Sequence, residues 1–146
     1  MAAAIGTLGK LGIDSVSPVT KMFDFRSDSL ARKDDSVNGN GVRGTGSHHI
    51  NRVRAGLQKI GGNIALQPNA YDLSLLLPWI LCGTTVSTWH KLGETAATRY
   101  VSIDRHGKVF NYATVGVGKA TFKADQGALL DCDLDLVACT ETVANA

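Results

Sequence analysis

The chain has 146 residues, of which 44% are hydrophobic and 19% are charged, and its formal net charge is +2. This length fits one domain that buries about 70% of its unfolded surface, and the ordinary apolar content argues against wholesale disorder. The small net charge gives no electrostatic argument for nucleic-acid binding.

The charges are unevenly distributed along the chain. Residues 1–70 contain nine Lys/Arg against five Asp/Glu, and residues 71–146 contain six against eight. Oppositely biased ends suit head-to-tail association of copies. The three cysteines lack metal-type spacing, and nothing in their pattern indicates an oxidising compartment. The N-terminus does not resemble a secretory signal, and no apolar run approaches the ~20 residues that span a bilayer. We therefore expect a protein made in the cytoplasm, with no membrane partner.

The N-terminal third contains little regular hydrophobic periodicity. Residues 1–20 mix Gly, Ser and small apolar residues, which predicts an arm that another surface must order. Lys21 to Phe25 is a candidate short strand. Arg26 to Ile50 is the most polar segment and predicts a long loop or an extended hairpin tip. Because structureless loops beyond ~15 residues are unusual in compact domains, such a loop is either functional or disordered.

Asn51 to Gln67 returns to the pattern of a β-strand. Its apolar residues change from odd to even positions between Leu57 and Ile60, just before Gly61-Gly62. One extra residue there would make a β-bulge. A long strand bent in this way can belong to two sheets.

Residues 69–83 form the one convincing helical pattern. Asn69 is suited to cap its start, Asp72 lies in its first turn, and Gly83 ends it. Pro78 should kink the helix or end its first half. Apolar residues nearly encircle it, which predicts burial by the sheet on one side and by a neighbouring subunit on another. The packing residues are Leu73, Leu76, Leu77, Trp79 and Ile80.

The stretch Arg99 to Cys139 predicts an antiparallel meander. Its last part alternates without error, with an apolar row on one face and Asp131, Asp133 and Asp135 on the other. Ala113 to Ala124 is the predicted hairpin partner, and a turn centred on Gln126 places Lys119 opposite Asp133. The apolar row contains Leu130, Cys132, Leu134, Leu136 and Ala138, so Cys132 is expected to be a buried free thiol.

Candidate metal sites and catalytic motifs are weak. His48 and His49 are adjacent, so in an extended segment they point in opposite directions. The three aspartates are spaced by ~6.6–7 Å along a strand, too far apart for one ion unless their side chains converge. The sequence contains no phosphate-binding loop, dinucleotide fingerprint or nucleophile elbow. We expect a protein that is not an enzyme and needs neither a metal nor a cofactor.

Several pieces resemble, in this order, the tail tube (major tail) proteins of long-tailed bacteriophages. They are LGIDSVSPVT, NGVRGTGSHHINRVRAGLQKIGGNIALQPNAYDLSLLLPWILCG, SIDRHGKVFNYATVGVGKATF and GALLDCDLDLVACTETV. The resemblance runs from Gly12 to Val143 and rests on overall pattern. It implies an antiparallel β-sandwich or β-roll with one flanking α-helix and a long extended loop, with residues 21–146 as a single domain.

The resemblance also implies a role. Such subunits form rings, and the rings stack into a hollow virion tail tube that conducts double-stranded DNA without binding it specifically. Single-domain subunits form hexamers, whereas relatives with a second domain form trimers. This sequence contains no second copy, so it is either a single-domain version or a fragment, and the ring count depends on which. Other tail proteins are the implied partners.

Two groups of residues receive roles from this comparison. The meander would line the channel, through Asp131, Asp133 and Asp135 with Lys119 and Lys123. Residues 26–50 would reach the adjacent ring, through Arg32, Lys33, Asp34, Asp35, Arg43, His48 and His49.

Two alternatives remain open. A neck, tail-terminator or tail-tip protein shares the fold but forms one ring. A β-sandwich module that binds carbohydrate or another ligand would need exposed aromatic side chains, for which Trp89 is the candidate.

Overall fold

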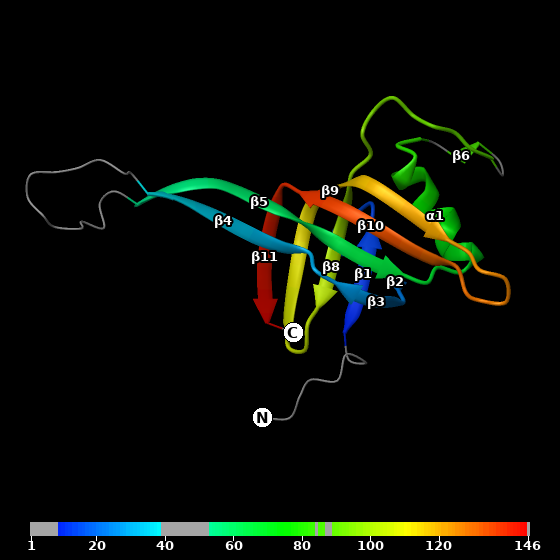
Figure 1. Ribbon diagram of the computed structural model, residues 1–146, viewed down its shortest axis with the longest axis horizontal. Coiled ribbons are helices and arrows are strands. Elements are labelled where there is room, and N and C mark those ends of the chain that lie inside the picture. The colour runs from blue at the N-terminus through cyan, green and yellow to red at the C-terminus, as the bar shows by residue number, and fades with distance from the viewer. Residues whose placement is uncertain (1–8, 39–52, 84, 87–88, 146) are drawn as a thin grey trace, which may run out of the picture.

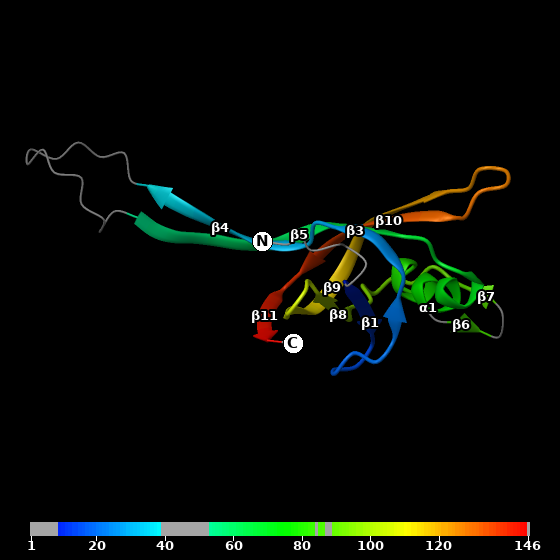
Figure 2. The ribbon, with the colours of Figure 1, turned by 90° about the horizontal axis from the view of Figure 1, so that it is seen from below.

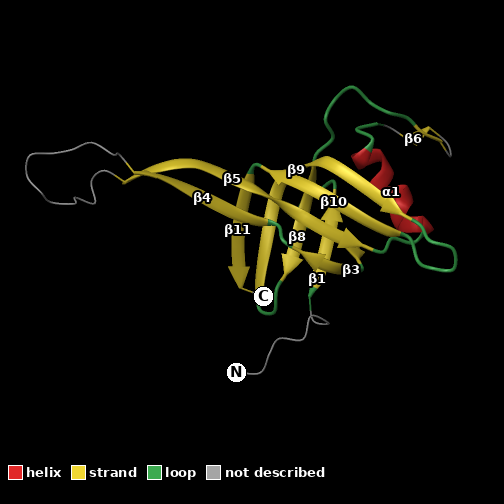
Figure 3. Cartoon of the chain, in the orientation of Figure 1, coloured by secondary structure: helices red, strands yellow, loops and turns green. Residues whose placement is uncertain are grey.

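The computed structural model describes residues 9–38, 53–83, 85–86 and 89–145. Within them, nine strands pair antiparallel in one continuous sheet, and the single helix α1 (Ala70–Ile80) lies beside one end of it (Figure 1, Figure 3). β6 (Thr85–Val86) and β7 (Trp89–His90) form a separate small hairpin. The sequence-based prediction of a mainly β fold with one flanking helix is confirmed.

The sheet folds over on itself into two layers that cross (Figure 2). The first layer contains β3 (Phe25–Asp28), β4 (Ala31–Asn38), β5 (Val53–Leu66), β10 (Asp131–Ala138) and the second half of β9 (Lys108–Lys123). The second layer contains β1 (Lys10–Asp14), β2 (Met22–Phe23), β8 (Arg99–Asp104), β11 (Thr140–Asn145) and the first half of β9.

β9 is the strand that connects the two layers. Its first half pairs with β8 and β11, and its second half pairs with β10. Thr114 has a φ of 54° where the register with β8 shifts, and an extra residue at Gly118 shifts the register with β10. Such bulges increase local bending and twist. The sequence allowed the segment after Asn51 to be shared between two sheets, but β9 has this role, and among the described residues β5 pairs with strands of the first layer.

β5 nevertheless contains the predicted bulge. Asp34 pairs with Gln58 and Ser36 pairs with Ala55, so β5 holds one residue more than β4 between these pairs. The bulge lies slightly before the predicted position and well before Gly61-Gly62.

Two N-terminal predictions need correction. Lys10–Asp14 is an interior strand between β2 and β8, and Leu11 and Ile13 are fully buried, so this part of residues 1–20 is not an arm. For the segment after Arg26 the loop reading is wrong and the hairpin reading holds for the described part, because β3 and β4 pair along β5. Residues 1–8 and 39–52 lie outside the described residues.

α1 begins after Asn69, the predicted N-cap. The Asn69 side chain accepts from the Asp72 backbone N–H at 2.9 Å, and the Asp72 carboxylate accepts from the Asn69 N–H at 3.2 Å. This capping box satisfies two N–H groups at the helix start. The helix continues through Pro78 to Ile80, and Cys82, rather than Gly83, takes the positive φ after its end. No helix of the described residues is long and apolar enough to cross a membrane.

The core lies between the two layers and under α1. Trp79 is 1% exposed, and its indole N–H donates to the Val115 carbonyl of β9 at 3.1 Å. Leu76 is also buried, whereas Leu73, Leu77 and Ile80 are half-buried. The Arg99 guanidinium donates to the Leu75 carbonyl at 3.2 Å, and burial lowers the pKa of Arg99. These contacts tie the helix to β8 and β9.

Candidate functional site

The outer face of the first layer carries the predicted aspartate row. Along β10, Cys132, Leu134 and Leu136 are buried, whereas Asp133 and Asp135 are exposed and Asp131 is half-buried. The predicted alternation of this strand is confirmed. Burial raises the pKa of the Cys132 thiol to about 11, as expected for a thiol without polar surroundings.

The cross-strand register brings the two predicted lysines to this row. Lys123 lies opposite Asp131 and Lys119 lies opposite Asp135, while Asp133 lies opposite Thr121. The predicted pairing of Lys119 with Asp133 was therefore wrong. The hairpin is centred on Gly127 instead of Gln126, because the segment between the strands spans residues 124–130.

Neighbouring side chains bond to two of the three aspartates, and one of these contacts is an ion pair with Arg26. Asp131 accepts from the Gln67 amide at 2.9 Å and from the Arg26 guanidinium at 3.1 Å. The bond from Gln67, followed by the attraction of Arg26, holds the pKa of Asp131 below its usual value. Asp135 accepts from the Asn63 amide at 3.0 Å. The face is therefore a mixed-charge surface rather than a purely acidic one.

This surface has no metal-binding geometry. Among the described residues, no three His, Cys, Asp or Glu side chains cluster closely enough to hold an ion. The three aspartates follow one strand, and Asp131 and Asp135 bond to different neighbours.

The β4–β5 hairpin is the second candidate region. It extends well beyond the body of the protein as a two-stranded arm (Figures 1 and 2). Arg32 and Lys33 are exposed, and the Arg32 Nε donates to the Asp34 carboxylate at 2.8 Å. This bond raises the pKa of Arg32. The side chain of Asp35 is not described, and Arg43, His48 and His49 lie outside the described residues.

The first layer ends in two open edges. The second half of β9, from Gly116 to Lys123, pairs only with β10 among the described strands. At the opposite side of the layer, β3 and β4 pair only with β5. Unpaired N–H and C=O groups along such edges are templates for pairing with another chain.

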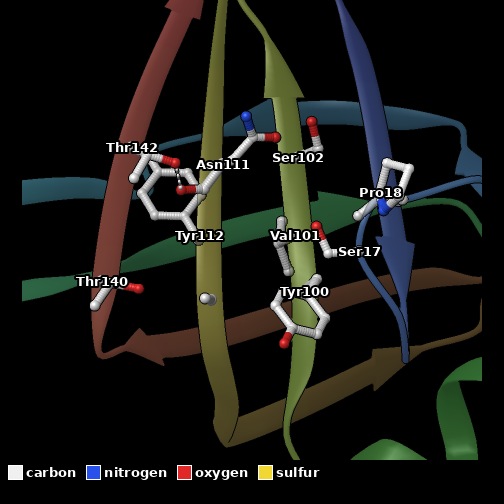
Figure 4. A pocket seen from close by; sticks show the side chains of 11 residues that line it. Ser17, Pro18, Tyr100, Val101, Ser102, Asn111, Tyr112, Thr140 and Thr142 are labelled. Carbon is white, nitrogen blue, oxygen red and sulfur yellow. Dashed lines mark hydrogen bonds between the residues drawn. The ribbon is translucent and has the colours of Figure 1, made fainter.

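A groove of about 330 Å³ lies on the outer face of the second layer and has no counterpart in the sequence predictions (Figure 4). Its walls are mainly small hydroxyl and amide side chains of β8, β9 and β11, with Tyr100 and Pro18 at one side. No charged side chain lines it. Each residue type is ordinary for a sheet surface, so no motif could reveal the groove.

The exposed aromatic residue predicted for a ligand-binding module is also present. Trp89 is 74% exposed on the small β6–β7 hairpin, away from the groove lining. Tyr100 on β8 and Phe122 on β9 are also partly exposed, at 37% and 42%.

Comparisons with known proteins place the fold. No protein-family model and no curated protein match the sequence. Among solved structures, a chain from the tail of an empty gene transfer agent particle, refined with C6 symmetry, aligns with a TM-score of 0.67, 7% identity and 99% coverage of both chains. A chain of the SPP1 tail tube aligns with a TM-score of 0.64 and 7% identity, over 99% of this chain and 80% of that one.

A third similar structure comes from a contractile injection system. It is a chain of the PVC sheath/tube terminator, with a TM-score of 0.64, 11% identity, and coverage of 93% of this chain and 92% of that one. The alignments extend over nearly the whole chain, so the shared feature is the complete arrangement of strands and helix. The chain therefore has the fold of tail-tube and tube-terminator proteins.

Proposed function

We propose that this chain is a structural virion protein that self-assembles into stacked rings, and that the rings form the hollow tube through which phage DNA leaves the particle. The observation that carries the proposal is the match of 99% of the chain to a tail-tube subunit fold, in the SPP1 tail tube. The proposed location is the tail of the virion, after synthesis in the host bacterial cytoplasm. Other tail proteins are the proposed partners at the two ends of the tube.

The open edges of the first layer supply a physical means of closing a ring. The free edge of β9 in one copy would meet the β3–β4 edge of the next, so that each copy has one donor edge and one acceptor edge. Such head-to-tail contacts close into rings when the rotation between copies permits it. A hexamer is the favoured ring, since the similar gene transfer agent tail has C6 symmetry. A trimer would follow if a second domain continues the chain.

The proposed channel wall is the outer face of the first layer. Asp131, Asp133 and Asp135 with Lys119 and Lys123 would point into the bore. Each cationic contact with a DNA phosphate adds affinity through counterion release. Because this set holds three aspartates against two lysines, and Lys123 also forms an ion pair with Asp125 at 3.1 Å, the wall would offer DNA little net attraction.

The arm supplies a means of stacking. A two-stranded ribbon is marginally stable alone in water, so a long arm is expected to rest on another surface. We assign that surface to a subunit of the adjacent ring, in agreement with the role implied for residues 26–50. The described charged side chains of the arm that would meet this subunit are Arg32, Lys33 and Asp34.

Negative-stain microscopy of the purified full chain tests the proposal. Long tubes of uniform diameter are expected when the concentration is raised at neutral pH. Isolated single rings would instead support the terminator alternative, which the match to the PVC sheath/tube terminator favours. A protein that remains monomeric at high concentration would contradict both.

A further inference from the structure

On the β4 side, the arm is connected to the body through a two-residue joint, Ser29–Leu30, between β3 and β4, whereas β5 continues from the arm into the body as one strand. Asp28 pairs with Ile64 of β5, and Ala31 pairs with Gly61, so the joint lies across Gly62 and Asn63. Leu30 is fully buried in the core. A Cβ on Gly62 would lie 2.4 Å from the Ser29 carbonyl oxygen, which shows that the joint contacts the backbone of β5 directly.

Two side chains of the second layer donate hydrogen bonds to the Leu30 carbonyl group of the joint. The buried Tyr112 hydroxyl donates to the Leu30 oxygen at 2.9 Å, and the Arg105 Nη2 donates to the same oxygen. The Arg105 Nε also donates to the Asp28 carboxylate at 2.9 Å. Since a carbonyl oxygen has two lone pairs, these donors satisfy the Leu30 oxygen completely. The joint is thus fastened to β9 and to the turn between β8 and β9.

The surroundings position the Arg105 guanidinium and keep both donors protonated. The Arg105 guanidinium lies 4.7 Å over the ring of Phe110. Burial acts to lower the pKa of Arg105, but the hydrogen bond and charge of Asp28 outweigh it, so the guanidinium stays charged. Burial raises the pKa of Tyr112 to about 12, so its hydroxyl remains a donor at neutral pH.

A third contact reaches the arm itself. The Arg32 backbone N–H, two residues after Leu30, donates to the Glu141 carboxylate of β11 at 3.2 Å. Three elements of the second layer, namely β9, β11 and the turn before β9, therefore hold the base of a hairpin that belongs to the first layer.

We propose that Arg105 and Tyr112 are positioning residues that fix the angle at which the arm leaves the body. The arm would then meet a second copy of the chain in one orientation. Holding a contacting segment in its bound geometry before association lowers the ordering cost of binding. The assembly part of this inference rests on the proposed function, whereas the effect on arm direction does not.

Pulsed electron spin resonance on the dilute, unassembled chain tests the arm direction. Cys139 is exposed and accepts one spin label, and Asn38→Cys at the far end of β4 accepts the second. Cys82→Ser removes the half-buried thiol, and Cys132 is fully buried.

Two variants remove the donors to the joint. Tyr112→Phe removes only the hydroxyl, and Arg105→Lys removes the forked donor. Thr142→Val is the matched control, since it deletes a hydroxyl of the same layer that bonds to Asn111.

We expect a narrow distance distribution in the parent chain and in Thr142→Val, and loss of that narrow distribution in Tyr112→Phe and Arg105→Lys. Equally narrow distributions in all four proteins would overturn the proposal, whether or not the parent forms tubes. If Arg105→Lys does not fold, Tyr112→Phe alone decides the result, because it leaves the core volume nearly unchanged.

Assembly is measured separately on the unlabelled chain. Tyr112→Phe should raise the concentration needed for tube formation by about fivefold or more, an effect on the scale of one lost hydrogen bond, while Thr142→Val should leave it unchanged. A broadened arm distribution with an unchanged assembly threshold would overturn the assembly part. Absence of tubes from the parent chain would instead contradict the proposed function. The spin-label result would then still decide whether Arg105 and Tyr112 fix the direction of the arm.

Discussion

Asp135 lies directly opposite Lys119 across the β9–β10 pair. Asp131 and Lys123 form the second such pair, at the end of the strands near the turn. Between them Asp133 lies opposite Thr121 and is the one aspartate of the row without a lysine across from it. The charge pattern of the proposed channel wall is therefore set by strand register.

Thr121→Lys should complete the row of pairs. Opposite charges on directly facing positions stabilise antiparallel strands by about 0.2–1 kcal/mol. Urea denaturation of Thr121→Lys and Thr121→Gln, which has similar bulk without the charge, measures the difference. The lysine variant should be the more stable one in low salt, and the advantage should shrink in 1 M salt, where the Debye length is about 3 Å. Equal stability of the two variants in low salt would show that Asp133 gains nothing from a cation at this position.

Gly62→Ala should damage the joint of the arm. The added Cβ would meet the Ser29 oxygen at 2.4 Å and the Leu30 Cα at 2.6 Å, and both are backbone atoms that cannot rotate away. Overpacking of this kind costs about 1–3 kcal/mol of unfolding free energy. Gly116→Ala is the control, because an added Cβ there meets nothing within 4 Å. Equal stability of the two variants would contradict the close contact at the joint.

The folded protein should lose stability in acid because of Asp14. It is 2% exposed, and its carboxylate accepts from the Thr20 hydroxyl at 2.7 Å and from the Ser15 N–H at 2.7 Å. The Thr20 bond, foremost among these contacts, holds the pKa of Asp14 well below its ordinary value of 3.8. A lowered folded-state pKa contributes stability that is present above the ordinary value and is lost as the pH falls below it.

The variant Asp14→Asn tests this pH dependence. Its melting temperature should be lower than that of the parent at pH 7, and the two curves should converge as the pH falls from about 4 toward 2. Thermal melts followed by circular dichroism across this range supply the measurement. Parallel curves would show that another group dominates the acid response.

The cysteines should differ sharply in reactivity. Cys139 is exposed, whereas Cys132 is fully buried and has a pKa of about 11. Only the thiolate attacks a disulfide reagent. At pH 8 the fraction of a thiol with this pKa that is ionised is about a hundredfold smaller than for an ordinary thiol. Titration with an aromatic disulfide should label Cys139 quickly and Cys132 only after denaturation. Rapid labelling of Cys132 in the native protein would contradict the burial of its strand face.

Local patterns predicted those parts of the fold that local physics determines. Period-two alternation identified β10 because one of its faces is buried and the other is in water. Asn69 and Asp72 identified the helix start because a capping box involves only neighbouring residues. The hairpin register failed because a turn that is longer than expected moves every pair together.

The sequence did not identify β1 and left β4 open between a loop and a hairpin, for physical reasons. β1 is short and contains Gly12, so its five residues show too little periodicity. β4 is polar along most of its length because much of it extends beyond the body, where no core requires an apolar face. The joint at Leu30 depends on Arg105 and Tyr112, which lie 75 and 82 residues away in the sequence. Only the folded arrangement of both layers brings these groups together.

The central claim is that copies of this chain form a tube whose bore is lined by the outer face of the first layer. Helical cryo-electron microscopy of the assembled full chain tests it most directly. We predict stacked rings in which β9 of one copy pairs with the β3–β4 edge of the next, with Asp131, Asp133 and Asp135 facing the bore. A tube in which this face lies on the outer wall, or is buried between subunits, would contradict the claim.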